Sequence, residues 1–247
     1  MSDLLTALGA GRGDVVAMVG AGGKTTLIYR LAAVARERGL RVVVTTTTHM
    51  GLLPESITGP VFVEAEGSAD ALLDEGLRRE GRATLLGRRI RSDKLEGIAP
   101  SRVDELAHRA DLVLVEADGA RGRSLKLPAA HEPVVPSSTT LLVVVAALDV
   151  LGAPLDDTRV HRLEIVSDAI GRATGTLVRE GDLVAVLRHP AGYLSRAGGR
   201  TRPAVFLNKA EGPEAAAAAE RIARDLIPPY ALVAAGSARR GEARSWT

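Results

Sequence analysis

A glycine-rich stretch ending in a lysine and two threonines constrains this chain more than any other feature. Residues 20–26 read Gly-Ala-Gly-Gly-Lys-Thr-Thr and follow the apolar run 15–18. Apolar residues then recur at helical spacing from Leu27 to Ala35. A strand, a glycine-rich turn and a helix N-terminus in this order predict a phosphate-binding loop, because glycine lets backbone N–H groups converge on an anion.

The loop predicts the contacts of a bound nucleoside triphosphate. Lys24 supplies an ammonium group for the β- and γ-phosphates, and the Thr25 hydroxyl is a natural ligand for Mg²⁺. The full Walker A pattern has a further glycine where this chain has Met18, so the shorter form G-x-G-G-K-T-T resembles the loops of Mur-type ligases. The residues expected to hold the phosphates are Gly20, Ala21, Gly22, Gly23, Lys24, Thr25 and Thr26.

The length and the pattern of apolar runs predict one α/β domain. With 247 residues the chain is expected to form a single P-loop NTPase-like domain over 1–247, with a doubly wound, mostly parallel sheet and helices on both faces. Two smaller features are expected inside it. One is a short strand pair near 83–98 that carries a cluster of basic residues, and the other is a helical segment near 155–200 that glycines and prolines interrupt.

The composition of the chain excludes several classes of cofactor and binding partner. The chain has no cysteine, which excludes disulfides, thiolate metal sites and a cysteine-borne sulfur or selenium carrier. A net charge of only +2 and few aromatic residues argue against nucleic acid as a partner. The absence of a long apolar run and of a signal-peptide layout leads us to expect a cytoplasmic protein without a membrane partner. The oligomeric state stays open.

A second strong pattern is an apolar run that ends in carboxylates. Residues 112–115 are Leu-Val-Leu-Val, and Glu116 and Asp118 follow. This pattern is typical of a Walker B strand, whose acid holds Mg²⁺ directly or through water. Glu116 is the first candidate for that acid and Asp118 is the alternative. With Lys24 and Thr25 they form the predicted catalytic group.

Polar residues near these strands are candidates for binding a second substrate. The run 41–45 ends in threonines and a histidine, and the irregular charged stretch 118–136 follows the acidic strand. Basic residues there would bind phosphates or an anionic substrate, and a histidine or glutamate could do proton or metal chemistry. The alternative is a solvated loop whose charges serve solubility. The candidates are Thr47, Thr48, His49, Arg121, Arg123, Lys126, His131, Glu132 and Arg162.

The third pattern predicts a pocket for the nucleotide base. Asn208, Lys209 and Glu211 follow a strand and resemble the N-K-x-D motif with which GTPases recognise guanine. Ser237 and Ala238 follow a further strand and resemble the S-A-K loop that backs the guanine. Glutamate in place of aspartate adds a methylene group, so GTP is only slightly favoured over ATP.

The combined motifs resemble the YqeC family over residues 14–238. The matching pieces are V-G-A-G-G-K-T-T, V-V-V-T-T-T-T-H-M, L-V-E-A-D-G-A-R-G-R-S-L-K, H-E-P-V-V-P, V-H-R and F-L-N-K. Members are described as accessory or cofactor-biosynthesis proteins of selenium-dependent hydroxylases. The resemblance implies a P-loop NTPase fold and a role in maturing a selenium-dependent molybdenum hydroxylase or its cofactor. Glu211 departs from the usual N-K-x-D acid, and Ser124 stands where the family often has proline.

The sequence therefore predicts a Mg²⁺-dependent protein that binds GTP or ATP and hydrolyses it. Two alternatives remain open. One is a phosphotransferase or Mur-like ATP-dependent ligase that acts on a small anionic substrate. The other is a GTPase-like switch that binds a hydroxylase and uses hydrolysis for release.

Overall fold

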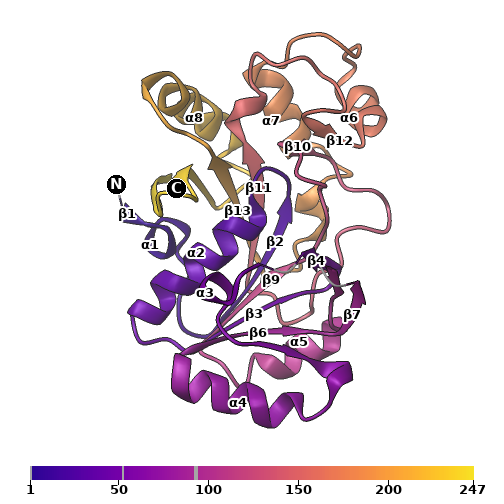
Figure 1. Cartoon of the computed structure of the whole chain (residues 1–247). Helices are drawn as coiled ribbons and strands as arrows, with labels where there is room; N and C mark the ends of the chain where they lie inside the picture. The colour runs from indigo at the N-terminus through magenta and orange to yellow at the C-terminus, as the bar shows by residue number, and fades with distance from the viewer. Residues whose placement is uncertain (1, 52, 92–93) are drawn as a thin grey trace.

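A ten-stranded sheet forms the centre of the molecule (Figure 1). The computed structural model describes residues 2–51, 53–91 and 94–247. Eight neighbouring strands run parallel, and each of the two further strands at one edge pairs antiparallel with the strand before it. Their spatial order is β1 (Ser2–Asp3), β15 (Glu242–Trp246), β14 (Leu232–Ser237), β13 (Arg202–Asn208), β11 (Leu141–Ala147), β2 (Asp14–Gly20), β9 (Leu112–Glu116), β3 (Val42–Thr46), β6 (Arg82–Leu86) and β5 (Val61–Val63).

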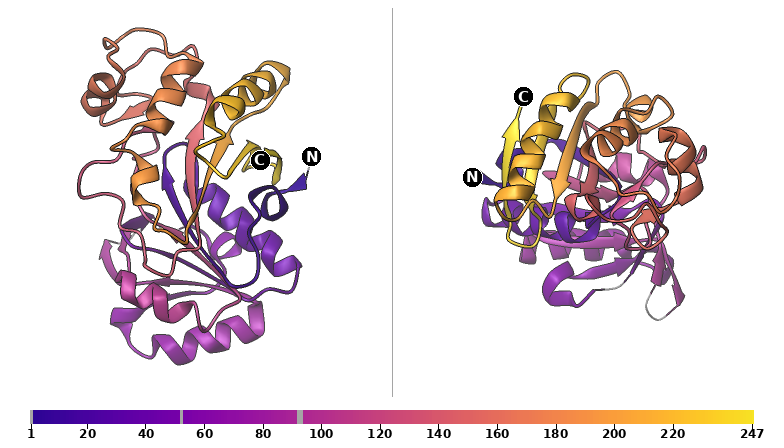
Figure 2. Two further views of the ribbon diagram at one scale, coloured as in Figure 1. Left: turned by 180° about the vertical axis from the view of Figure 1, so that it is seen from behind. Right: turned by 90° about the horizontal axis from the view of Figure 1, so that it is seen from above.

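Helices cover both faces of this sheet, as predicted (Figures 1 and 2). Alternate residues of a strand point to opposite faces, so Val143 packs with the cluster of α1 and α2 while Val144 packs with that of α7 and α8. A third cluster joins α4 and α5 to the strands β9, β3 and β6. The bounds are α1 (Leu4–Leu8), α2 (Lys24–Glu37), α4 (Ala69–Glu80), α5 (Pro100–Leu106), α7 (Glu180–Arg188) and α8 (Pro213–Leu226). The chain thus has the predicted P-loop NTPase-like α/β architecture.

The neighbours of β2 determine where functional groups meet. This strand lies between β9 and β11, and all three are parallel. In parallel sheets the carboxyl ends of the strands lie at one edge, where ligands of open α/β sheets bind. Met18 is paired with Glu116, so the glycine-rich loop after β2 and the acids after β9 are brought together.

The predicted strand pair near 83–98 is only partly correct. Residues 82–86 form β6, a buried strand of the main sheet parallel to β3, because Ala83, Thr84 and Leu85 are buried on both sides. The antiparallel pair is the shorter hairpin of β7 (Arg88–Arg91) and β8 (Lys94–Glu96). It pairs further with β4 (His49–Gly51) in a separate small sheet.

The segment near 155–200 is less helical than predicted. It contains α6 (Leu163–Ile170), α7 and the short 3₁₀ helix η3 (Tyr193–Arg196). Its first part forms β12 (Val160–His161), which pairs in parallel with β10 (Leu125–Lys126). The pairing attaches the charged stretch after β9 to this segment. The remaining short elements are α3 (Glu55–Thr58), η1 (Glu64–Glu66) and η2 (Leu148–Val150).

None of the helices in the described residues is long and apolar enough to cross a membrane.

Replacing a loop glycine tests this packing. A Cβ at Gly22 would lie 2.5 Å from the Ala147 Cβ, and the residue has φ +92°. Gly22→Ala should lower the free energy of unfolding by roughly 2–5 kcal/mol, because a left-handed conformation costs about 1–2 kcal/mol and overpacking about 1–3 kcal/mol. Chemical denaturation measures this.

Gly152→Ala is the matched control for that substitution. Gly152 has φ +73° and nothing within 4 Å of an added Cβ. Only the backbone cost of about 1–2 kcal/mol is expected there. Equal losses in the two variants would show that the contact with Ala147 does not constrain the loop.

Candidate functional site

The glycine-rich loop lies tightly against the neighbouring strand β11. A Cβ at Gly20 would approach the Val145 carbonyl oxygen to 2.3 Å, and the Ala21 N–H donates to that oxygen at 2.8 Å. Gly20 has φ +91° and Gly23 has φ +112°, which other residues rarely adopt. Helix α2 then begins at Lys24. Its N-cap residue is Gly23, so no side chain at that position accepts a hydrogen bond from the first N–H groups of the helix. The first N–H groups of α2 are therefore available to an anion.

Lys24 and Thr25 are held by the acids that follow β9. The Lys24 ammonium is 4% exposed, donates to the Gly20 carbonyl at 2.6 Å, and lies 3.2 Å from Asp118 Oδ1. It also lies 3.9 Å from Glu116 Oε1. The Thr25 hydroxyl donates to Glu116 Oε2 at 2.8 Å. The structure thus brings together the four residues predicted as the catalytic group.

Asp118 is the most enclosed of these groups. Its Oδ2 accepts hydrogen bonds from the Gly20 N–H at 3.2 Å, from Lys126 Nζ at 2.9 Å and from the Tyr193 hydroxyl at 2.8 Å. Its Oδ1 faces Lys24 without a hydrogen bond to any described residue. Two lysines therefore balance the buried carboxylates Glu116 and Asp118, as buried charges require.

Burial changes the acidity of the groups around Asp118. Burial raises the pKa of Glu116, against the opposing effect of the Lys24 ammonium and the Thr25 hydroxyl. Burial and the nearby Asp118 charge also raise the pKa of Tyr193 well above its ordinary value. Tyr193 is consequently a proton donor to Asp118 at neutral pH. A further cation beside Glu116 would offset this effect of burial by stabilising the charged carboxylate.

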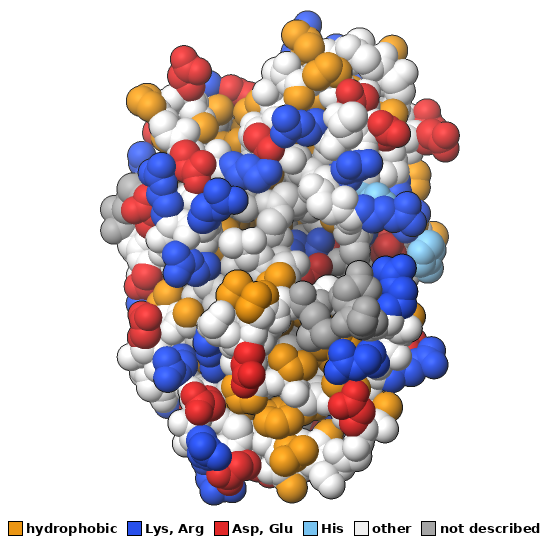
Figure 3. All heavy atoms as spheres, in the orientation of Figure 1, with side chains coloured by type: hydrophobic (Ala, Val, Ile, Leu, Met, Phe, Trp, Pro, Cys, Tyr) orange, Lys and Arg blue, Asp and Glu red, His pale blue; other side chains and the backbone are white. Residues whose placement is uncertain are grey.

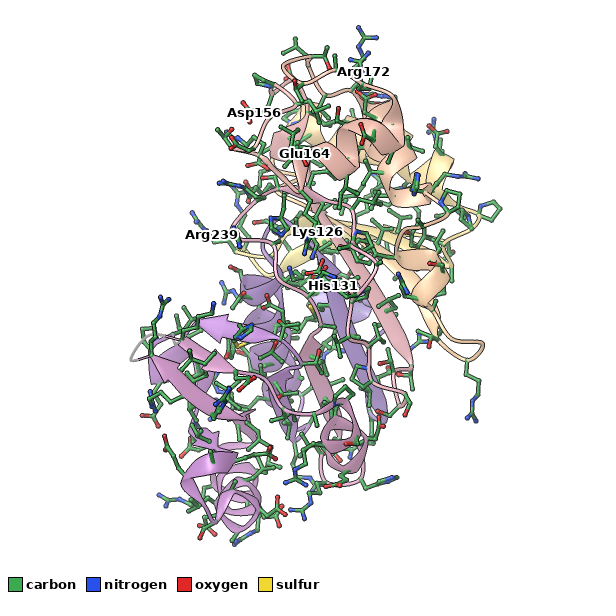
Figure 4. All side chains as sticks on the ribbon, turned by 90° about the vertical axis from the view of Figure 1, so that its right-hand side faces the viewer. Lys126, His131, Asp156, Glu164, Arg172 and Arg239 are labelled. Carbon is green, nitrogen blue, oxygen red and sulfur yellow. The ribbon has the colours of Figure 1, made fainter. Side chains whose placement is uncertain are left out.

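A chain of ion pairs leads from Asp118 to a second carboxylate. Lys126 Nζ contacts Glu132 Oε2 at 2.9 Å as well as Asp118, and Arg162 Nη2 contacts Glu132 Oε1 at 3.1 Å. Burial alone would raise the pKa of Glu132, but Lys126 and Arg162 outweigh it and lower this pKa to about 2. Glu132 is therefore ionised at neutral pH. Figure 4 shows Lys126 in the middle of the molecule, between the sheet and the segment that carries α6.

Glu132 and Arg162 also line a cleft of about 820 Å³, here called the cationic pocket. In Figure 3, lysine, arginine and histidine side chains gather at mid-height on the right-hand side of the molecule, near β4 and β7. Five predicted substrate residues besides Glu132 line the pocket, from three separate parts of the chain. The full lining is Thr48, His49, Lys94, Gly119, Arg121, Arg123, Glu132, Asp157, Val160, His161, Arg162 and Leu163.

Three residues predicted to contact substrate have other positions. The Thr47 hydroxyl donates to the Val134 carbonyl at 2.7 Å and fastens the charged stretch to β3. His131 is exposed and does not line the cationic pocket. The side chain of Lys126 is 0% exposed, and its ammonium contacts Asp118, Glu132 and the Gly119 carbonyl in the interior. The expectation that Lys126 binds substrate directly is therefore wrong for this arrangement, because its ammonium is already enclosed by acceptors.

The residues of the predicted base pocket do meet in one cleft, of about 210 Å³. Asn208 connects its parts, because its Nδ2 donates to the Gly22 carbonyl at 2.7 Å and its Oδ1 accepts from the Ala238 N–H at 3.0 Å. The Ser237 hydroxyl donates to Glu211. The cleft is lined by Gly23, Thr26, Asn208, Lys209, Glu211, Ser237, Ala238 and Arg239.

Tyr193 and Asp149 gave no sequence signal, whereas His161 and Thr46 adjoin predicted substrate residues in the chain. Tyr193 lies 75 positions from Asp118, within a stretch expected only to be helical. Asp149 forms an ion pair with Lys209 at 2.7 Å, and His161 lines the cationic pocket. The Thr46 hydroxyl donates to the Glu116 carbonyl at 2.7 Å. Only strand and helix packing places these residues beside the motifs.

The strand order, the glycine loop and the acids after the neighbouring strand define an α/β protein with a P-loop. The family model described as "YqeC protein" matches residues 16–164. An uncharacterized protein YqeC from Escherichia coli (strain K12) is 35% identical over 211 residues, covering 84% of this chain and 81% of that protein. The chain therefore belongs to the YqeC family.

Solved structures with a similar arrangement are more distant. FtsY from Mycoplasma mycoides is 13% identical, with a TM-score of 0.45 over 95% of this chain and 63% of that one. The hydrogenase maturation factor HypB from Archaeoglobus fulgidus is 16% identical, with a TM-score of 0.43 over 93% of this chain and 84% of that one. This chain thus spans less than two thirds of the FtsY chain. Because both TM-scores are below 0.5, the fold assignment rests on the strand order and the sequence family.

The lowered pKa of Glu132 predicts a loss of stability in acid. The unfolded chain binds a proton at Glu132 near the ordinary value of 4.5, whereas the folded protein does so near 2. Between these values the unfolded state binds more protons, so the free energy of unfolding falls as pH decreases from 4.5 towards 2. Urea denaturation at a series of pH values should show a smaller decrease for Glu132→Gln.

Glu214→Gln removes an exposed carboxylate on α8 and is the control. Its pH dependence should follow that of the unaltered protein. Parallel curves for Glu132→Gln and the unaltered protein would show that the contacts of Glu132 with Lys126 and Arg162 do not stabilise the folded state.

Proposed function

We propose that this protein binds a nucleoside triphosphate with Mg²⁺ and hydrolyses it. The observation that carries the proposal is the convergence of Lys24, Thr25, Glu116 and Asp118 beside a strained glycine loop at a helix N-terminus. Three glycines at positive φ let this loop pack tightly against β11 and leave backbone N–H groups free of side chains that would block an anion. The buried charge balance gives Lys24 a fixed position at the mouth of this loop.

The residues present fit a magnesium ion. Thr25 and Glu116 offer a hydroxyl and a carboxylate oxygen that already lie 2.8 Å apart, and hard oxygen donors suit Mg²⁺, which usually takes one or two carboxylates beside phosphate oxygens. A bound cation would also satisfy Glu116, whose pKa burial raises. When bound, Mg²⁺ supplies electrostatic stabilisation of charge on the phosphates.

The chain's own groups account for the binding and the charge stabilisation. Lys24 would leave the Gly20 carbonyl and turn to the β- and γ-phosphates, while N–H groups of residues 22–26 would hold the phosphate oxygens. The N–H groups of Gly20 and Ala21 already donate to Asp118 and to the Val145 carbonyl. Asp118 keeps the loop in place through the Gly20 N–H. Lys126 and Tyr193 keep Asp118 oriented, and Tyr193 holds its proton.

The base of the nucleotide would lie in the cleft of Asn208, Lys209 and Glu211. A carboxylate at Glu211 can accept from the ring N–H and amino group of guanine, and adenine has neither donor in that place. Because the Glu211 side chain is longer than the aspartate of the N-K-x-D motif, we expect GTP to be only slightly favoured over ATP. Lys209, now paired with Asp149, has a mobile stem that could cover the base.

The role of this activity in the cell follows from the family resemblance. We infer that nucleotide hydrolysis assists maturation of a selenium-dependent molybdenum hydroxylase or its cofactor, in the cytoplasm. The cationic pocket favours a second candidate, namely transfer of a phosphoryl group, or ligation, onto a small anionic acceptor. Release of nucleoside diphosphate that depends on an added acceptor would distinguish this candidate from simple hydrolysis.

Removing the lysine of the loop tests nucleotide binding. Lys24→Ala should weaken the affinity for Mg²⁺–GTP or Mg²⁺–ATP by roughly 10- to 100-fold, because a charge-assisted hydrogen bond contributes about 1.5–3 kcal/mol. Titration with fluorescent nucleotide analogues measures the affinity. Circular dichroism and the unfolding midpoint establish that the variant is folded.

Thr25→Val and Arg224→Ala complete that experiment. Thr25→Val leaves the buried charges balanced and should remove most of the gain in affinity that Mg²⁺ provides. Arg224→Ala removes a cation from the exposed face of α8 and should change nothing. Unchanged binding in folded Lys24→Ala protein would overturn the proposed function.

The base pocket is tested by comparing GTP with ATP. Glu211→Gln should weaken the GTP analogue by roughly 10-fold or more, through the loss of charge-assisted hydrogen bonds to guanine, and leave the ATP analogue unchanged. Glu214→Gln, on the first turn of α8, is the control. A preference of the unaltered protein for ATP would show that residues 208–211 do not read guanine.

A further inference from the structure

The cationic pocket adjoins the phosphate loop but is separate from it. Gly119, which follows Asp118 directly, lines the pocket, whereas the described residues 20–26 do not. The pocket is bordered by β4 on one side and by β12 and the start of α6 on the other. A ligand in this pocket would therefore lie beside the acids of the nucleotide site without competing for the loop.

The charges that line this pocket are unequal. Four permanent cations, Lys94, Arg121, Arg123 and Arg162, face only two carboxylates. One of these, Glu132, is shared between Arg162 and the buried Lys126. Within residues 2–51, 53–91 and 94–247, no ion pair involves Arg121, Arg123 or Lys94. Like charges gathered in a cleft repel one another and favour an anion.

Arg162 gives a second, independent indication of a ligand. Its Nη2 contacts Glu132, but its Nε is buried and has no hydrogen-bond partner among the described residues. A buried guanidinium N–H without an acceptor is costly, and a ligand oxygen would satisfy it. Arg162 also has φ +60°. The backbone at the start of α6 is therefore held in an unfavourable left-handed conformation, which fixes the position of this residue.

We propose that the cationic pocket binds a small molecule through a phosphate group. Three guanidinium groups offer forked donors that match a dianionic phosphate better than a single carboxylate. A volume of about 820 Å³ suits a small molecule. The proposal rests on the proposed function only in that the ligand would lie next to the bound nucleotide, as an acceptor or as an effector.

The ion pairs behind the pocket give this ligand a defined place relative to the nucleotide. Arg162, Glu132, Lys126 and Asp118 form a continuous chain, each in contact with the next at 2.9–3.1 Å. Asp118 in turn lies 3.2 Å from Lys24. A ligand that takes Arg162 as a partner thus acts on the same network that positions Lys24. Glu132 and Lys126 are positioning residues in this scheme.

Histidine resonances can report binding at this pocket alone. The chain has five histidines, of which His49 and His161 line the pocket while His108 and His189 do not. We would titrate inorganic phosphate into the full chain saturated with Mg²⁺ and a non-hydrolysable GTP analogue, so that the phosphate loop is occupied. Ionic strength is held constant with chloride. The expected result is a saturable shift of the His49 and His161 ring protons.

Variants separate the pocket from general charge effects. Arg123→Ala combined with Arg162→Ala should weaken phosphate binding at least ~10-fold, and Arg224→Ala should leave both phosphate and nucleotide affinity unchanged. Because Arg162→Ala leaves Glu132 with one partner fewer, Arg121→Ala with Arg123→Ala is a second pair that removes two cations without disturbing an ion pair.

The outcomes distinguish this proposal from the proposed function. Saturable shifts that both arginine pairs abolish support the pocket. Absence of a saturable shift, equal shifts in all five histidines, or shifts unaffected by either pair would overturn it. Failure of the GTP analogue to bind would instead contradict the proposed function. The phosphate titration would then be repeated on Lys24→Ala protein, where the same histidine shifts decide the pocket.

Discussion

The arrangement of the site depends on the buried carboxylate of Asp118. One of its oxygens accepts from the loop at Gly20, from Lys126 and from Tyr193, and the other faces Lys24. A carboxylate that is 0% exposed is tolerated only when such partners replace its hydration. Gly20, Lys126 and Tyr193 lie in β2, the charged stretch and η3. One buried charge thereby fixes the positions of three distant parts of the chain.

This arrangement explains why the charged stretch after β9 is not a free loop. Lys126 holds it to Asp118, β10 pairs it with β12, and Thr47 fastens it to the end of β3. These attachments place Arg121 and Arg123 around one cleft with Arg162. The phosphate loop, the base cleft and the cationic pocket all lie at the edge of the sheet where parallel strands end, so a nucleotide and a second ligand can be adjacent.

Short-range patterns predicted several groups of residues that the structure places together. In each case a short motif directly follows a strand, so local backbone geometry and the neighbouring strands leave its residues little freedom of position. The examples are the loop of residues 20–26, the acids Glu116 and Asp118, and the contact region of Asn208 and Ser237. The errors concern residues whose role depends on burial. Lys126 reads as a substrate-binding cation in a charged stretch, yet it is enclosed. Residues 82–86 read as half of a hairpin, yet they join the main sheet through parallel pairing with β3.

By itself, the sequence determined the P-loop, the acidic strand end, the α/β architecture and membership of the YqeC family. These depend on local periodicity, on glycine at positive φ and on motifs with short spacing. Only the tertiary structure decided that Tyr193 donates to Asp118, that Glu132 links Lys126 to Arg162, and that Lys94 and His161 share a cleft with Arg121. Contacts of this kind join residues that are far apart in the chain, and their strength comes from burial, which no local pattern encodes.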